Sequence, residues 1–156
     1  MWSDGKKLVV GESTNDRVLI WNTIPTTNGA AADVVVGAAN MTTQGSDTPS
    51  ATSIGDPHAV TSDGTSLFVS DAQFHRVLIY RPFPTANGAA ASQVLGQSNF
   101  TLAAGNDPNQ DGVSEGVVSA RTFGINSFSP GGLRVIGRKL FVVDYGNHRV
   151  LIFDSK

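Results

Sequence analysis

Residues 107–112 are the part of the sequence most similar to a metal-binding motif. They read Asp-Pro-Asn-Gln-Asp-Gly, so oxygen-bearing side chains stand at Asp107, Asn109 and Asp111, with Glu115 a few residues on. This spacing matches the first half of an EF-hand loop, in which carboxylate and amide oxygens ligate Ca²⁺. The twelfth position of the loop, however, carries no carboxylate. The motif therefore predicts either a weak calcium site or an ordinary turn of Asp, Asn and Gly.

An acid followed five residues later by an arginine occurs three times in similar surroundings. The three pairs are Glu12 and Arg17, Asp71 and Arg76, and Asp144 and Arg149. An acid that ends one strand and an arginine that begins the next face each other across a hairpin, where charge-assisted hydrogen bonds can hold the turn. Because each unit has such a pair, we predict a structural role rather than a catalytic one.

Histidine is the usual general base or metal ligand of a neutral site, and two of the three histidines precede these arginines. His75 and His148 occupy equivalent positions, and Asn147 belongs to the same turn as His148. The first unit has Asp16 at that position. This substitution argues against a shared metal or catalytic task. The sequence also lacks the motifs of a serine nucleophile elbow, a phosphate-binding loop and a zinc protease.

An internal repeat positions the acid–arginine pairs and the two histidines that precede the arginines. The string Arg-Val-Leu-Ile-aromatic occurs at 17–21, 76–80 and 149–153, and each copy follows a short run of Val, Leu and Phe. Such runs, bounded by Gly, Asp and Asn, are typical of strands joined by tight turns. Since no sustained helical period is present, we expect an all-β fold of antiparallel meanders.

The second unit predicts four strands, at 58–61, 67–70, 77–80 and 94–96. The flanking units are shorter. For the first we expect only the last three strands, near Leu8, Val18 and Val34; for the third we expect only the first three, near Leu133, Phe141 and Val150. Repeats of four short strands are typical of propeller blades.

The third unit resembles the NHL repeat. Its segment 130–133 (Pro-Gly-Gly-Leu), the apolar strand that ends in Asp144, and the run Asn147-His148-Arg149 are similar to the pattern of that family. The second unit keeps His75 and Arg76, with Phe in place of the usual Asn, and the first unit keeps Asn and Arg. The resemblance implies β-propeller blades, a six-bladed ring and, most often, a binding role. It also implies a minority alternative, since some related propellers are metal-dependent enzymes.

The units predict a single domain, 1–156, that is only part of a propeller. They cover approximately 1–43, 54–102 and 130–156, and long inserts lie between them at 42–56 and 101–129. Propellers usually have about four to eight blades, so one complete blade and two incomplete ones do not close a ring. Either two copies form a six-bladed homodimer, or the remaining blades belong to a longer parent chain. Both interpretations remain open.

The composition of the chain excludes several classes of binding partner and metal site. The formal net charge is −2, which gives no electrostatic basis for binding nucleic acid or an anionic membrane. There are no cysteines, so disulfides and thiolate metal sites are excluded. No apolar run has the roughly 18 residues that span a bilayer, and no signal peptide is evident. We expect a soluble chain, and the sequence does not indicate its compartment.

The leading functional expectation, which follows from the resemblance, is a non-enzymatic binding or scaffold module. Its loops or central channel would contact a protein or a small ligand. It would need no cofactor beyond weakly bound calcium at the 107–115 loop. The alternative is a metal-dependent propeller enzyme of lyase or hydrolase type, completed by a second copy or by a longer chain. Its channel-facing candidates are His58, Ser62 and Arg134.

Overall fold

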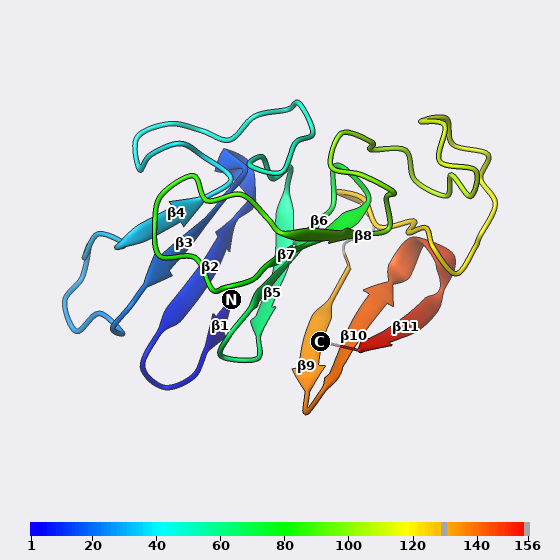
Figure 1. The fold of residues 1–156 in the computed structure, drawn as a ribbon. Coiled ribbons are helices and arrows are strands. Elements are labelled where there is room, and N and C mark those ends of the chain that lie inside the picture. The colour runs from blue at the N-terminus through cyan, green and yellow to red at the C-terminus, as the bar shows by residue number, and fades with distance from the viewer. Residues whose placement is uncertain (129–130, 155–156) are drawn as a thin grey trace.

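The computed structural model describes residues 1–128 and 131–154, which fold into three antiparallel β-sheets (Figure 1). Two sheets have four strands and the third has three, and the described residues contain no α-helix. The all-β prediction is therefore confirmed. Pro130, which the sequence places at the start of the third unit, lies outside the described residues.

Each sheet is built from one repeat unit, with its strands in sequence order. The first sheet contains β1 (Trp2–Ser3), β2 (Leu8–Glu12), β3 (Arg17–Trp21) and β4 (Val34–Val36). The second contains β5 (Pro57–Ser62), β6 (Leu67–Asp71), β7 (Arg76–Tyr80) and β8 (Gln93–Leu95). The third contains β9 (Leu133–Ile136), β10 (Lys139–Asp144) and β11 (Arg149–Asp154). Short 3-10 turns span Ser13–Asn15 and Tyr145–Asn147.

The prediction of three strands for the first unit is wrong, because β1 is a fourth. Trp2 pairs with Val9 and Ser3 pairs with Leu8. Two residues are too few to show an alternating pattern, so the sequence gives no sign of this strand. The hairpin that follows is held by Asp4, whose Oδ1 accepts the N–H groups of both residues after Gly5, at 2.8 and 2.6 Å. The prediction for the third unit, three strands, is confirmed.

Alternate side chains along a strand point to opposite faces of its sheet, so each sheet here has two faces. We call one of them the forward face and the other the reverse face. The forward face carries Val9, Val18 and Ile20 in the first sheet, Phe68, Val77 and Ile79 in the second, and Phe141, Val150 and Ile152 in the third. These three sets occupy the same repeat positions.

The sheets stack in series, each forward face against the next reverse face. One core cluster joins the forward face of the first sheet to the reverse face of the second, where Val69, Leu78 and Tyr80 are buried. A second core cluster joins the forward face of the second sheet to the reverse face of the third, which contributes Leu140 and Val142. Among residues 1–128 and 131–154, no sheet lies against the reverse face of the first sheet or the forward face of the third.

The first strands of the sheets lie close together, and the loops gather at one end. β5 contacts β1, β2 and β9 (Figure 1). The insert 42–56 and the described part of the second insert, 101–128, both run over the same end of the stack, opposite the hairpins that join the first two strands of each sheet. The chain thus places its longest loops side by side.

Candidate functional site

The acid–arginine pair of the second unit is completely buried. The Arg76 Nε donates to Asp71 Oδ2 at 2.8 Å, and neither side chain is exposed. The other nitrogens donate to main-chain carbonyls: Nη1 to Phe100 at 2.6 Å, and Nη2 to Ser50 and Ser53 at 3.1 Å each. Arg76 therefore links its own hairpin to the insert before it and to the loop after β8.

The pairs of the flanking units make only part of this set of bonds. Arg17 donates to Glu12 and, through Nη1, to the Met41 carbonyl at 2.6 Å, the equivalent of the Phe100 bond. Arg149 donates to Asp144 and, through Nη2, to the Thr122 carbonyl at 2.6 Å, the equivalent of the Ser53 bond. Each of the three pairs thus joins the two strands of its own hairpin and binds a main-chain carbonyl outside that hairpin.

The acid of the pair has a lowered pKa in the first unit and a raised pKa in the second. Hydrogen bonds from Arg17, and from Asn15, hold the pKa of Glu12 below its usual value. Burial raises the pKa of Asp71 to about 6, against the opposing pull of Arg76. Desolvation of a carboxylate therefore outweighs its ion pair in the middle of the stack.

The residues before the arginines share a backbone conformation. Asp16, His75 and His148 have φ angles of 53°, 51° and 52°. Asp, Asn and His adopt this left-handed region more readily than most residues, which explains why Asp and His exchange at this position. Burial also lowers the pKa of His75. Asn147 lies beside this position and donates to Asp144 Oδ2 and to Asn106, both at 2.8 Å.

The predicted channel residues do not converge on one point. His58 is exposed and contacts Asp56 Oδ2 through Nε2 at 3.0 Å. Ser62 is at the other end of β5, about 13 Å away along the strand, and its hydroxyl donates to the Ser66 carbonyl at 2.6 Å. Arg134 lines a cavity of about 260 Å³ between β1, β5 and β9. Neither His58 nor Ser62 lines that cavity.

The acidic loop brings three of its four predicted ligands together. Carboxylate oxygens of Asp107, Asp111 and Glu115 lie within 4.8 Å of one another, an arrangement that can hold a cation. Asn109 instead donates to Asp111 Oδ2 at 3.2 Å. Asp107 is fully buried, and its two oxygens accept the N–H groups of Gln110, Asp111 and Gly112. The Asp107 carboxylate therefore also caps the turn, as the alternative interpretation predicts.

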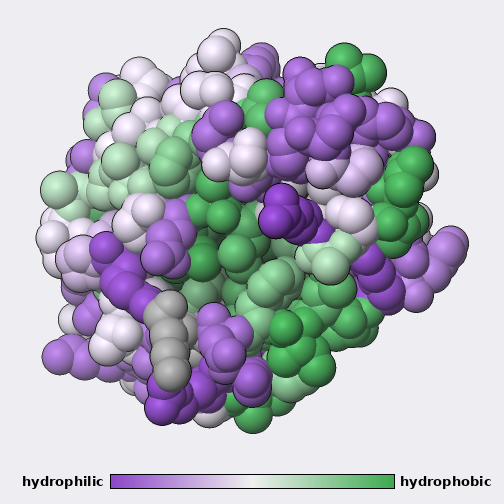
Figure 2. Space-filling model, turned by 45° about the vertical axis from the view of Figure 1, so that its right-hand side comes forward, coloured by the Kyte–Doolittle hydropathy of each residue, from purple (hydrophilic) through white to green (hydrophobic). Residues whose placement is uncertain are grey.

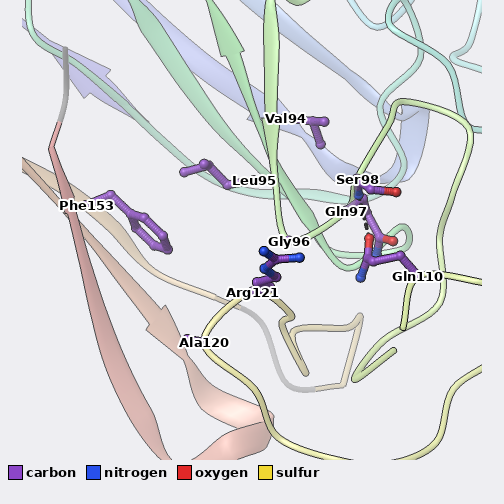
Figure 3. A pocket seen from close by; sticks show the side chains of 9 residues that line it. All are labelled: Val94, Leu95, Gly96, Gln97, Ser98, Gln110, Ala120, Arg121 and Phe153. Atoms are coloured by element: carbon purple, nitrogen blue, oxygen red, sulfur yellow. Dashed lines mark hydrogen bonds between the residues drawn. The ribbon is translucent and has the colours of Figure 1, made fainter. Parts of the chain in front are cut away.

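A cavity of about 320 Å³ lies between the outermost strands of the second and third sheets (Figure 3). Val94 and Leu95 of β8 line one side and Phe153 of β11 another, with Ala120 and Arg121 of the insert nearby. The sequence did not indicate this cavity, because its walls come from three segments far apart in the chain.

No family model matches the chain, and no curated protein matches it either. No helix in the described part of the chain has the length and apolar character needed to cross a membrane.

Proposed function

We propose that this chain is a three-unit segment of an NHL-type β-propeller that serves as a non-enzymatic binding and scaffold module. The observation that supports this most directly is the serial stacking of forward faces on reverse faces. Such stacking is the arrangement of propeller blades, and it is open-ended: whatever sheet continues the series must offer a reverse face at one end and a forward face at the other.

The two faces at the ends of the stack, the forward face of the third sheet and the reverse face of the first, carry apolar residues like those of an interface. On the forward face of the third sheet, Val150 and Ile152 are 55% and 58% exposed, whereas the equivalent Val77 and Ile79 are buried. The reverse face of the first sheet presents the half-buried Leu19. Figure 2 shows hydrophobic residues that run from the middle of the molecule to its lower right edge, with hydrophilic residues mostly above them and at the lower left. Uncovered apolar surface of this kind marks an interaction site.

A second copy of this chain is the partner that fits both faces. The interface between sheets is heterologous, since a forward face meets a reverse face, and heterologous interfaces form rings when the rotation closes. Two copies supply six units, so the forward face of each third sheet would cover the reverse face of the other copy's first sheet. The loops at one end of the stack and the cavity that Arg134 lines then remain available to a protein or small ligand.

The alternative, a metal-dependent propeller enzyme, has weaker geometric support. It requires channel residues that converge on one ion, yet His58 and Ser62 stand at opposite ends of β5. Of the three candidates, Arg134 alone lines the cavity between β1, β5 and β9. The carboxylate cluster Asp107–Glu115 belongs to an insert rather than to a first strand of a sheet. The arrangement therefore favours the binding role.

The test is the solution mass of the purified chain, measured by light scattering after size exclusion across a concentration series. We expect a stable species at twice the chain mass of 16.3 kDa. Ile152→Asp should convert it to monomer without unfolding, because a carboxylate would be buried in the interface. Phe128→Asp, a change at a loop residue that is 96% exposed, is the matched control and should leave the dimer intact. A monomer at every concentration would refute the ring of two copies.

A further inference from the structure

A cavity of about 720 Å³ lies at the end of the stack where the loops gather (Figure 1). Residues 37–39, which directly follow β4, line its base. The insert 42–56 lines one side, and Asn87 and Gly88 of the second unit line another. Segments of two neighbouring repeat units therefore enclose a single space between them.

The insert that lines this cavity is held in place. Its composition, rich in Ser, Thr and Gly, is typical of flexible linkers. Main-chain hydrogen bonds of 2.7–3.1 Å nevertheless join four of its residues to atoms outside it: Gly45, Ser50, Ala51 and Ser53. Two of these bonds come from the buried Arg76. Within the insert, the Ser53 hydroxyl donates to the Thr48 carbonyl at 2.8 Å. This side of the cavity is thus preorganised, which lowers the entropic cost of binding a ligand.

The opposite side of the cavity is fixed on the outer edge of β4. Asn87 Oδ1 accepts the Val35 N–H at 3.0 Å, and the Gly88 N–H donates to the Val35 carbonyl at 2.9 Å. Both main-chain groups of Val35 are therefore occupied, so a peptide cannot add a strand at this residue. Within residues 1–128 and 131–154, Asn87 Nδ2 makes no hydrogen bond. Its two N–H groups remain available to a ligand.

The lining of the cavity is polar but uncharged. Of the twelve described residues that line it, six carry a hydroxyl, two carry an amide, and four are glycine or alanine. Ser46 Oγ accepts the Thr48 N–H at 3.2 Å but donates to none of the described residues, and the Thr48 hydroxyl has no partner among them. Hydroxyls both donate and accept hydrogen bonds. They are therefore suited to a ligand that carries hydroxyls of its own.

The same lining disfavours the other common classes of small ligand. A phosphate or carboxylate is bound by cationic side chains, and a nucleobase stacks on an aromatic ring. Neither kind of side chain is among the described residues that line the cavity. The methyl groups of its threonines and alanines alternate with hydroxyls, as C–H and O–H groups do around a sugar ring. The volume also lies within the range of about 300–1,000 Å³ that is usual for small-ligand sites.

From these observations we propose that the cavity between the insert 42–56 and the loop at Asn87 binds an uncharged oligosaccharide. Asn87 Nδ2 and the hydroxyls of Ser46 and Thr48 bond the sugar hydroxyls, and the sugar C–H groups lie on residues 37–39. This assignment rests on the binding role proposed above and names its ligand class. The cavity lies apart from the forward face of the third sheet, so a sugar can bind to monomer and dimer alike.

The experiment uses the full chain and three neutral trisaccharides: maltotriose, cellotriose and triacetylchitotriose. Saturation-transfer NMR measures binding, with trigalacturonate as the charged counterpart. We expect at least one neutral sugar to bind saturably at one site per chain, and trigalacturonate to bind far more weakly. In the isotope-labelled chain, the amide signals that shift should be those of residues 37–53 and 87–88.

Two variants locate the site. Thr48→Val keeps the shape of an exposed side chain but removes its hydroxyl, and should weaken binding about fivefold. Ala39→Trp, at an exposed residue of the lining, fills the cavity and should weaken binding at least tenfold. Thr26→Val makes the first substitution at an exposed threonine outside the lining, and should bind as the wild type does. Circular dichroism confirms that each variant is folded.

Four outcomes would overturn the proposal. The first is that no neutral trisaccharide binds at millimolar concentration. The second is that a sugar binds but both lining variants bind it unchanged, because the site would then lie elsewhere. The third is that trigalacturonate binds as tightly as the neutral sugars. The fourth is that a tetra-alanine peptide shifts the same amides at lower concentration than any sugar, which would assign the cavity to a peptide.

Light scattering on the same samples separates this proposal from that of the ring. A monomer that binds a sugar would refute the ring of two copies and support the saccharide site. A dimer that binds none of the sugars would support the ring and refute the site.

Discussion

The second sheet and the third sheet carry nearly the same sequence string, yet they present different surfaces. In the second sheet, Ile79 is 6% exposed and Asp71 and Arg76 are fully buried. In the third sheet, the equivalent Ile152 is 58% exposed and Arg149 is partly accessible. Within the described residues, the second sheet has four strands and a neighbouring sheet on each face, whereas the third has three strands and a neighbouring sheet on its reverse face alone. The environment of a repeat unit is therefore set by its neighbours in the stack, as in other repeat proteins.

Of the changes considered, breaking the buried ion pair of Asp71 and Arg76 should lower the free energy of unfolding most. Arg76→Met leaves the Asp71 carboxylate without its partner in a dry environment, which costs about 3–5 kcal/mol of unfolding free energy. Arg17→Met, at the partly exposed equivalent pair, should cost about 1 kcal/mol. Urea unfolding followed by circular dichroism measures both. Equal losses would show that the two pairs do not differ, and the double variant Asp71→Asn, Arg76→Met should recover stability relative to Arg76→Met.

The next largest loss of unfolding free energy should come from shortening an isoleucine side chain on the forward face of the second sheet, compared with the same change on the third. Ile79→Ala removes a buried side chain and should cost about 2–5 kcal/mol. Ile152→Ala removes an exposed one and should cost within about 0.5 kcal/mol in dilute solution. The same urea experiment, repeated over a range of protein concentrations, sharpens the comparison. A cost for Ile152→Ala that grows with concentration would report burial by a second copy, while a large cost at every concentration would contradict the exposed face.

The pH dependence of stability should follow from Asp71. Its pKa is raised to about 6 from the ordinary 3.8, so between these values the folded chain binds a proton that the unfolded chain does not. The contribution of Asp71 to stability is therefore greatest at low pH and declines as the pH rises from about 4 to about 6, by an amount on the order of 1–3 kcal/mol. Unfolding free energies across this range measure the decline.

Asp71→Asn removes the titrating group and should abolish that decline, although it lowers stability at every pH. If this variant does not fold, the carboxyl carbon of Asp71 in the wild type can be titrated by NMR. A midpoint below 4 would contradict the raised pKa. Glu12, whose pKa is lowered by Arg17, serves as the internal comparison, because its contribution is present at neutral pH and is lost only as the pH falls.

The smallest expected effect concerns the edge of the first sheet. Asn87 Oδ1 accepts the Val35 N–H at 3.0 Å, and the Gly88 N–H donates to the Val35 carbonyl at 2.9 Å. Asn87→Ala should cost about 1 kcal/mol and should speed hydrogen exchange at the Val35 amide. Asn28→Ala changes the equivalent loop, which caps no strand among the residues that the structure describes, and should leave that exchange rate unaltered. Similar effects of the two variants would count against the cap.

The sequence was sufficient to predict where most strands lie, but not which atoms their side chains contact. Short apolar runs between turn residues located ten of the eleven strands in the described part of the chain, and the two-residue β1 was missed because it shows no alternation. The repeat also identified the acid–arginine pairs. It could not identify the carbonyls that Arg76 binds, since Ser50, Ser53 and Phe100 contribute main-chain oxygens that any residue would offer. The Asp107 loop was ambiguous for a related reason: one carboxylate can cap a turn and face a cation.

The contact between Asn87 and Val35 also bears on how the chain folds as it is synthesised. Its partners are 52 residues apart, so the outer edge of β4 stays open until the ribosome has released the loop of the next unit. An open edge can pair with a strand of another chain. The N-terminal sheet is therefore completed by residues made after it, and translation speed through the second unit determines how long the nascent chain is exposed to mispairing.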